Sequence, residues 1–384
     1  ETGINLVLGN NGIIAKAKDA ETKSAEAREN DLKGMNSLIE QMESTLNGSG
    51  NGGKTEPETV PYLPSDDFHY DTSTSIDTGL VIKDANGNEY VWVVVPRTIA
   101  VYKTTGLGKT TFTDADYTSI ENDLKEYTKT YRGSTSYSDT YTADDKNVGW
   151  FADATAYNNL KNSMLKSVYE NGGFYIGRFE EGTANAKEST TKGTSAGPVS
   201  KINMYPYRSL TLPEAMDLTK KVNAGNRTCT LMYEVQWNLV LAHLHNKGNI
   251  SDTVLTQNSD SIGNTSSVSF TLNRGKYYAN YNRGWQAYNV DYYNEDDEYY
   301  LVKSKVKQKH AALLTTGAAD RNKVMNIYDF AGNLTEWTIG VYSSTHWPCV
   351  VRGNSYNSGS NAANHGYYAW YEYDGNIGFR VSIY

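Results

Sequence analysis

The sequence is short of the residues that define several functional classes. It contains only two cysteines, Cys229 and Cys349, in 384 residues, and their spacing matches no metal-binding motif. They either form one disulfide in an oxidising compartment or stay as free thiols, and we favour free thiols. No apolar run approaches the roughly 20 residues that a membrane span needs. No cluster of Lys and Arg is present, which argues against nucleic acid or an anionic membrane surface as a partner.

Tyrosine, by contrast, is abundant. The chain has 31 Tyr against 8 Phe, with a formal net charge of −8. A tyrosine buries its ring and keeps a hydroxyl group for water or a partner, so this surplus predicts many rings at surfaces. Surfaces rich in Tyr, Ser, Gly and Asn share the composition of antibody paratopes. The composition therefore favours a binding protein.

Two segments precede the main part of the chain. Residues 4–46 are predicted to be helical, because Leu32, Met35, Ile39, Met42 and Leu46 recur at three- and four-residue steps. Residues 47–64 are rich in Gly and Pro and are predicted to be a linker. The chain opens with Glu1-Thr2-Gly3 rather than Met, which suggests processing or an added terminus.

Residues 65–384 have an α+β pattern. Val91–Val95 and Phe174–Glu180 are predicted as strands, and 84–88 as a hairpin turn rather than a calcium loop. Helices are predicted over 155–170, 212–223 and 231–245, the second starting at the cap Thr211 with Pro213 in its first turn. Residues 103–148 are predicted as a long irregular excursion, 246–300 as loops and short strands, and the last hundred residues as short strands with long connections.

Five stretches resemble the formylglycine-generating-enzyme branch of the C-type lectin fold, in the right order over about residues 88 to 384. Asn326–Thr338 resembles the family's Y-D-x-x-G-N-x-x-E-W signature, and Val351–Ser355 resembles R-G-G-S-W. The other matches are Phe174–Glu180, Leu231–Trp237 and the closing strand Ile377–Val381. The resemblance implies that fold with long loop insertions. It also implies a scaffold motif made of Asp329, Gly332, Asn333, Glu336, Trp337, Arg352, Gly353, Gly378, Phe379 and Arg380.

The enzymes of that family use a pair of cysteines near the C-terminus. The segment after Arg352 contains no cysteine, and Cys229 lies far away at a predicted helix start. We therefore expect neither catalytic residues nor a cofactor, since a fold does not carry its function with it. Glu336 and Asp329 are expected to make scaffold hydrogen bonds. A structural calcium ion near the motif stays open.

The first stretch of the chain has a different resemblance. Ile4–Ala17 resembles the segment that follows the apolar half of pilin-like helices in Gram-positive bacteria. The resemblance implies a stem over 1–46 that contacts pilin subunits through 4–46. Contact with the membrane is expected only through an N-terminal apolar segment that is missing here. The implied location is an extracellular, cell-surface pilus.

The segment 338–376 is crowded with aromatic and small polar residues, framed by the scaffold motif. This arrangement resembles the variable proteins of diversity-generating retroelements, whose positions near the C-terminus are diversified. Rigid rings supply contact area at low entropy cost, and small polar residues adapt to a partner. The predicted ligand-binding residues are Tyr342, Ser343, His346, Trp347, Ser355, Tyr356, Asn357, Asn361, Asn364, His365, Tyr367, Tyr368, Trp370, Glu372 and Asp374.

These observations predict an extracellular, pilus-displayed binding or adhesion protein, not an enzyme. Its partner would be a protein or glycan on another cell or phage. His346 and His365 are expected to be solvated or hydrogen-bonded rather than metal ligands, because no third ligand is apparent. Two alternatives stay open: a divergent enzyme of the formylglycine-generating type, in which Cys229 and Cys349 meet, and a phage-type receptor-binding protein. A calcium-dependent lectin is disfavoured, because its Glu-Pro-Asn and Trp-Asn-Asp signatures are absent.

Overall fold

The computed structural model describes residues 61–142, 150–191, 197–278, 284–290, 312–359 and 361–384, with three short strands at 292–294, 299–301 and 304–305. The predicted stem helix over 4–46 and residues 47–60 of the predicted linker lie outside this range. In the described part, no helix is both long and apolar enough to cross a membrane. The fold is a mixed α/β structure built on antiparallel sheet, as the α+β prediction expects.

The first sheet has six antiparallel strands in the order β1-β2-β3-β5-β21-β8. Their bounds are β1 Phe68–Tyr70, β2 Val81–Asp84, β3 Glu89–Val94, β5 Gly173–Gly177, β8 Cys229–Leu231 and β21 Val381–Ile383. The predictions of a strand near Val91–Val95 and of the hairpin turn before it are confirmed. In that turn, Asp84 Oδ1 accepts hydrogen bonds from the amides of Asn86 and Asn88. The predicted strand over 174–180 ends earlier, at Gly177.

The second sheet carries most of the predicted binding segment. Its strand order is β19-β18-β17-β20, and the short strand β4 pairs with the far part of β17. The bounds are β4 Tyr137–Ser138, β17 Thr335–Tyr342, β18 Cys349–Arg352, β19 His365–Tyr368 and β20 Ile377–Phe379. Only Arg380 separates β20 from β21, so one continuous segment passes from the second sheet into the first.

Six α-helices are described: α3 Asp114–Tyr127, α4 Lys129–Arg132, α5 Ala154–Asn171, α6 Leu212–Thr219, α7 Glu234–Asn246 and α8 Asp252–Thr256. The predicted helix over 155–170 is confirmed as α5, which Asp153 caps at its start and Gly172 ends at φ 69°. The predicted capping role of Thr211 is also confirmed, in a capping box with Glu214.

Four further sequence-based predictions need correction. Residues 103–148 are not an irregular excursion, since they contain α3 and α4. The helix after Thr211 ends at Thr219, not at 223. Residues 229–231 form β8, so Cys229 begins a strand and not a helix. The short helix α8 lies within the segment predicted as loops and strands.

The start of α7 is held from a distant part of the chain. The carboxylate of Asp139 accepts hydrogen bonds from the amides of Glu234 and Val235, at 2.9 and 3.1 Å. These amides are among the helix-terminal donors that lack an intrahelical partner. Because Asp139 follows β4, this contact ties the β4 segment to the helix below the second sheet.

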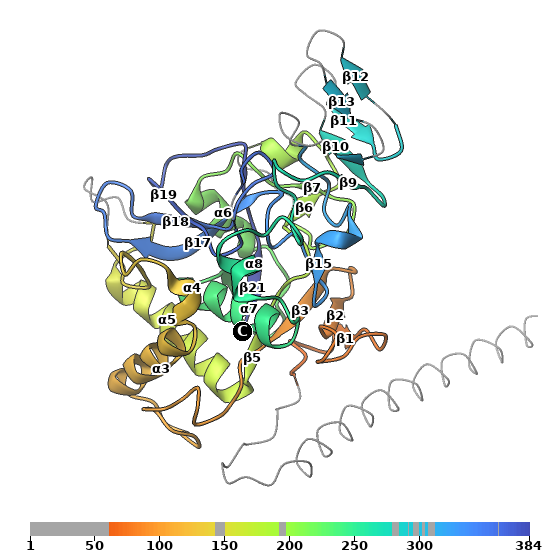
Figure 1. Ribbon diagram of the computed structural model, residues 1–384. Helices are drawn as coiled ribbons and strands as arrows, with labels where there is room; N and C mark the ends of the chain where they lie inside the picture. Colours follow the sequence, from red (N-terminus) through yellow and green to blue (C-terminus); the bar gives the residue numbers. More distant parts are fainter. Residues whose placement is uncertain are drawn as a thin grey trace, which may run out of the picture.

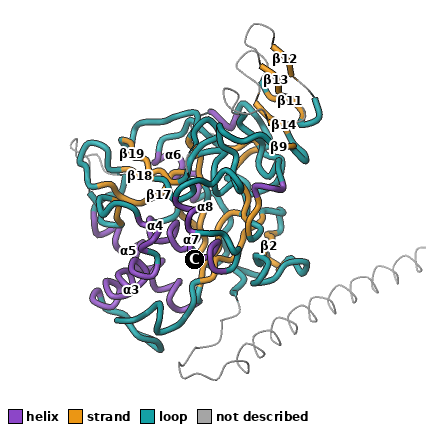
Figure 2. The backbone as a smooth tube through the Cα atoms, viewed as in Figure 1, coloured by secondary structure: helices purple, strands orange, loops and turns teal. Residues whose placement is uncertain are grey.

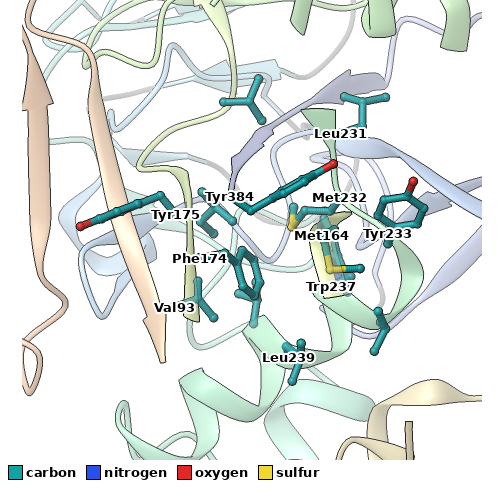
Figure 3. Close-up of a cluster of buried hydrophobic side chains, with 14 of the residues drawn as sticks. Val93, Met164, Phe174, Tyr175, Leu231, Met232, Tyr233, Trp237, Leu239 and Tyr384 are labelled. Atoms are coloured by element: carbon teal, nitrogen blue, oxygen red, sulfur yellow. The ribbon is translucent and has the colours of Figure 1, made fainter. Parts of the chain in front are cut away.

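The main core lies between the first sheet and the helices, with α5 and α7 packed on the strands (Figures 1 and 2). Figure 3 shows side chains from β3, β5, α5, α7 and the C-terminus meeting there. Trp237 of α7 is fully buried, and its ring stacks on Phe330 at 4.1 Å between centroids. Burial of such rings is the main stabilising contribution in a core of this kind.

Short two-stranded elements complete the fold. They are β6 Gly182–Thr183, β7 Tyr205–Pro206, β9 Phe270–Thr271, β10 Lys276–Tyr278, β11 Trp285–Ala287, β12 Tyr292–Asn294, β13 Tyr299–Leu301, β14 Ser304–Lys305, β15 Lys323–Val324 and β16 Ile327–Tyr328. Strands β9 to β14 form a lobe, called the projecting lobe below, whose hairpins extend away from the body (Figure 1). The prediction of short strands in the last part of the chain is confirmed.

Candidate functional site

The residues assigned to the scaffold motif form a buried frame under the candidate surface. Arg380 is fully buried, and its guanidinium donates to the Glu336 carboxylate, with Nη2 2.9 Å from Oε1. The same guanidinium donates to the carbonyls of Gly177 and Tyr328, at 2.9 and 2.8 Å. One cation thereby joins β5, β16, β17 and the junction between β20 and β21. Separating such an ion pair would leave a buried charge without a partner, which is strongly unfavourable. The pair therefore holds these strands in a fixed arrangement.

Asn333 closes the turn before β17. Its amide oxygen accepts a hydrogen bond from the Leu314 amide at 2.9 Å, and its amide nitrogen donates to Glu180 Oε2 at 2.5 Å. Glu180 is wholly buried, and burial raises the pKa of its carboxyl well above the ordinary value. Asn333 has φ 62° and the preceding Gly332 has φ 102°. Both values lie in the left-handed region, which glycine and asparagine tolerate best.

The same pattern holds for Asp329, which has φ 56°. Its carboxylate accepts hydrogen bonds from the Asn322 side chain at 3.0 Å and from the Gly317 amide at 3.2 Å. Burial raises its pKa to about 6. Trp337 is buried and donates its indole N–H to the Leu210 carbonyl at 2.8 Å. The remaining motif residues, Gly353, Gly378 and Phe379, are buried as well.

A second buried network connects the frame to the surface. The Arg352 guanidinium donates to Glu234 Oε1 at 2.7 Å and to Asn238 Oδ1 at 3.0 Å, both on α7. The same Glu234 oxygen lies 2.7 Å from His365 Nε2. The Arg352 cation and the hydrogen bond to His365 outweigh the desolvation of the Glu234 carboxyl and lower its pKa to about 2. Burial and the nearby Arg352 lower the pKa of His365, so its imidazole is neutral at pH 7.

From His365, aromatic rings lead outward to solvent. His365 stacks on Tyr137 at 4.1 Å, Tyr137 lies 5.0 Å from Tyr342, and Tyr342 stacks on Tyr367 at 4.5 Å with an interplanar angle of 7°. Trp347 follows at 6.2 Å from Tyr367. We call Tyr137, Tyr342, His346, Trp347, His365 and Tyr367 the aromatic ladder. Its buried end is fixed by the Glu234–Arg352 network, and its outer end is open to solvent.

The sheet register explains which rings point outward. In β19, Tyr367 pairs with Val350 and Tyr368 pairs with Cys349. Successive side chains in a strand point to opposite faces. Tyr367 accordingly joins the ladder, whereas Tyr368 turns inward and packs edge-on against Trp337 at 5.7 Å.

The turn that follows β19 forms a second exposed group. The Glu372 carboxylate accepts a hydrogen bond from the Ala369 amide at 2.8 Å, and Asp374 Oδ1 accepts one from the Asn376 amide at 2.7 Å. These bonds hold the backbone of the turn, called the 369–376 turn below. The rings of Tyr371 and Tyr373 on it are 39% and 57% exposed, comparable with 41% for Trp347 and 46% for Tyr367.

Thirteen of the fifteen predicted ligand-binding residues fall into three groups, and the other two are Ser343 and Tyr368. Tyr342, His346, Trp347, His365 and Tyr367 meet in the aromatic ladder. Trp370, Glu372 and Asp374 belong to the 369–376 turn. The backbone carbonyl of Asp374 accepts a hydrogen bond from the Ser209 amide. Ser355, Tyr356, Asn357, Asn361 and Asn364 lie in the loop between β18 and β19, and Ser343 is exposed at the end of β17.

Several of these side chains serve the scaffold. The indole of Trp370 and the ring of Tyr368 pack against the core. Ser355 is buried and donates its hydroxyl to Asn357 Oδ1 at 2.7 Å, within the same loop. The Asn364 amide nitrogen donates to the Gly353 carbonyl at 3.3 Å. Trp370, Tyr368, Ser355 and Asn364 thus make contacts within the fold, which sets them apart from the exposed rings of the ladder and the turn.

Three exposed or half-exposed rings were missing from the predicted set. Tyr137 comes from the segment predicted as an excursion and reaches the ladder only through the pairing of β4 with β17. Tyr371 and Tyr373 alternate with residues that were in the set. The alternation of aromatic and acidic residues over 370–374 was the available signal for these two.

Cys229 and Cys349 are not joined by a disulfide bond, so both are thiols, as favoured by the sequence. Burial raises the pKa of the Cys229 thiol well above its ordinary value. A thiol with a raised pKa is a poor nucleophile, since the thiolate is the reactive form. Across the described ranges, no group of three or more His, Cys, Asp or Glu side chains is placed to hold a metal ion.

Comparison with protein-family models, with curated proteins and with solved structures finds no match to this chain.

Proposed function

We propose that this chain is a binding protein that contacts a partner protein through the outer aromatic ladder and the 369–376 turn. The observation that carries the proposal is the distribution of exposed rings. Among the described residues, Trp347, Tyr367, Tyr371 and Tyr373 are four of the seven large hydrophobic side chains that are strongly exposed, and all four lie within 27 positions of each other. Exposed apolar groups gathered in this way mark interaction sites.

The arrangement suits recognition for two physical reasons. Stacking fixes Tyr342 and Tyr367 in place, so a partner would meet rings that lose little conformational entropy on binding. The frame below is held by the ion pairs of Arg352 and Arg380, so exchanges among the outer rings would leave those pairs intact. This separation is what a diversified binding protein requires.

The proposal extends to the setting of the domain. The order of the scaffold motif and its buried pairing support a C-type-lectin-like fold of the formylglycine-generating-enzyme type, although no solved structure matches it. The pilin-like character of residues 4–46 supports display on an extracellular pilus. A phage-type receptor-binding protein would use the same surface without such a stem.

The test is an array of purified bacterial and phage surface proteins with a parallel array of glycans. It is probed with the full chain and with a variant carrying Trp347→Ala, Tyr367→Ala, Tyr371→Ala and Tyr373→Ala. The control variant carries Ile99→Ala and Val290→Ala, which removes exposed side chains elsewhere. The variant with the four aromatic substitutions is called the ladder variant below. We expect at least one protein on the array to bind the parent chain and the control variant but not the ladder variant. Binding that both variants keep would contradict the site, and hits confined to glycans would contradict a protein partner.

A further inference from the structure

Arg208 lies in a setting unlike that of the frame arginines. It is half-buried, next to β7. No carboxylate of the described residues lies within ion-pair distance of its guanidinium, and its Nε is buried without a hydrogen-bond partner. Its guanidinium carbon lies 5.2 Å from the centroid of the Tyr278 ring. In a chain with eight more acidic than basic residues, a partly desolvated guanidinium without an acidic partner calls for an explanation.

Three aromatic rings and a second cation lie near Arg208 and extend onto the projecting lobe. Tyr278 packs edge-on against Trp285 at 5.4 Å, and Trp285 packs edge-on against Tyr205 at 5.1 Å. Lys276 lies with Nζ 5.2 Å from the Tyr205 ring and 2.5 Å from its hydroxyl oxygen. We call Tyr205, Arg208, Lys276, Tyr278 and Trp285 the basic aromatic cluster. It offers flat apolar faces between two positive charges.

The backbone around Arg208 is held in place. Its amide donates to the Ser189 carbonyl at 2.9 Å, and the next amide, that of Ser209, donates to the Asp374 carbonyl at 3.1 Å. Ser209 has φ 60°, a left-handed conformation that costs free energy for a residue other than glycine. Strain of this kind persists where the surrounding contacts fix it, so the guanidinium is presented from a rigid base.

Arg208 also borders the proposed contact surface. A side chain at Gly375 would approach the Arg208 Nη1 atom to 3.2 Å, so glycine leaves room for the guanidinium beside the 369–376 turn. That turn carries the exposed rings of Tyr371 and Tyr373. The basic aromatic cluster therefore continues the surface from the turn to the projecting lobe.

We infer that Arg208 binds a carboxylate of the partner, an Asp or Glu side chain in an acidic segment that lies across the basic aromatic cluster. The planar guanidinium matches a carboxylate through two parallel hydrogen bonds. The flanking rings exclude water from the ion pair and contact the apolar part of the acidic side chain, while Lys276 adds a second positive charge. This inference rests on the proposed function and specifies the chemistry of the partner at one end of its surface.

The test uses acetylated, amidated tetra-glutamate as the probe and tetra-glutamine of the same form as the neutral match. The readout is the indole N–H resonance of Trp285 in the ¹⁵N-labelled full chain, assigned with Trp285→Phe. We expect a saturable shift with tetra-glutamate and none with tetra-glutamine. Arg208→Gln should weaken the interaction about 10-fold, the size typical of losing one charged pair. Arg208→Lys should weaken it less, because the charge is kept without the planar fork.

The matched control is Arg227→Gln. Arg227 is also half-buried and stacks on a tyrosine, Tyr62, at 3.7 Å, but that ring packs against Trp92 and Tyr175 of the first sheet and not against the projecting lobe. We expect tetra-glutamate to bind Arg227→Gln as tightly as it binds the parent chain.

An unshifted Trp285 signal, or equal binding of tetra-glutamate to Arg208→Gln and to the parent chain, would overturn the inference. A response to glucuronate but not to tetra-glutamate would overturn the choice of a protein carboxylate. If Arg208→Gln disturbs the other indole signals, Arg208→Lys alone decides.

Failure of the carboxylate inference can be told apart from failure of the proposed contact surface. Removal of Trp347 and Tyr367 together with Tyr371 and Tyr373 tests the surface, whereas Arg208→Gln tests the acidic contact. A partner that loses binding to the ladder variant but binds Arg208→Gln as well as the parent would support the proposed function and contradict the carboxylate.

Discussion

Arg380 lies fully buried between the two sheets, and Arg208 lies half-buried beside the projecting lobe. Arg380 donates to Glu336 and to two backbone carbonyls, whereas Arg208 faces an aromatic ring and no carboxylate of the described residues. The same residue type thus holds the frame together in one place and offers an unused charge in the other. Burial together with pairing, rather than residue type, thus distinguishes the frame arginine from the arginine that we propose as a contact residue.

The largest difference in stability is expected when the charge of each arginine is removed in turn. Arg380→Met keeps most of the volume but leaves Glu336 buried without its cation. We expect a loss of about 3–5 kcal/mol in the free energy of unfolding, because one partner of a buried ion pair is removed. Arg208→Gln should change the same quantity by no more than about 0.5 kcal/mol. Urea unfolding followed by tryptophan fluorescence measures both.

The frame also predicts a pH dependence, to which the buried carboxyl of Glu181 contributes along with Glu180 and Asp329. This carboxyl is buried near Glu336 and Asp84, and desolvation raises its pKa from 4.5 to about 8 despite the opposing Arg380. The folded state holds the proton more tightly than the unfolded state. Its contribution to stability is therefore present below pH 4.5 and lost as the pH rises towards 8.

Glu181→Gln should remove this contribution and flatten the fall of stability over that range. At pH 8 to 9 the variant should be more stable than the parent by a few kcal/mol, since each unit of pKa shift corresponds to about 1.4 kcal/mol. Chemical unfolding at a series of pH values makes the comparison. If the free energy of unfolding changed with pH in the same way for the parent and for Glu181→Gln, the pKa of Glu181 would not differ between the folded and unfolded states, and the prediction would be wrong.

A smaller effect is expected from two neighbouring tyrosines of β19. Tyr368 packs inward against Trp337, and Tyr367 lies on the outer face. Tyr368→Ala should lower the free energy of unfolding by about 1–3 kcal/mol, whereas Tyr367→Ala should cost less than about 1 kcal/mol. Thermal unfolding of the two single variants decides whether the faces are assigned correctly, and equal losses would contradict the assignment.

Much of the fold was predictable where local chemistry decides the structure. The β-branched residues of 91–95, the cap at Thr211 and the helix predicted over 155–170 gave elements close to the observed ones. The pairing of Glu336 was also expected, because a carboxylate in a buried turn needs a partner. Gly332 and Gly353 have the positive φ that their motif positions suggested.

Other features depend on contacts that local sequence does not encode. Helix α3 buries only Ile120 and Leu124 as apolar side chains of its own, so its apolar stripe is too sparse to recognise. Tyr137 meets the ladder through strand pairing over about two hundred positions. The register of β19, which separates Tyr367 from Tyr368, follows from its pairing with β18.

The central claim is that a fixed frame carries a surface free to vary, and coding sequences of residues 338–376 from many closely related isolates test it most directly. We predict substitutions concentrated at Tyr342, His346, Trp347, Tyr367, Tyr371 and Tyr373. Over the same sequences Trp337, Arg352, Gly353, Tyr368 and the closing Gly378–Arg380 should hold constant. Substitutions spread evenly over buried and exposed positions, or an invariant segment, would contradict the diversified-surface account.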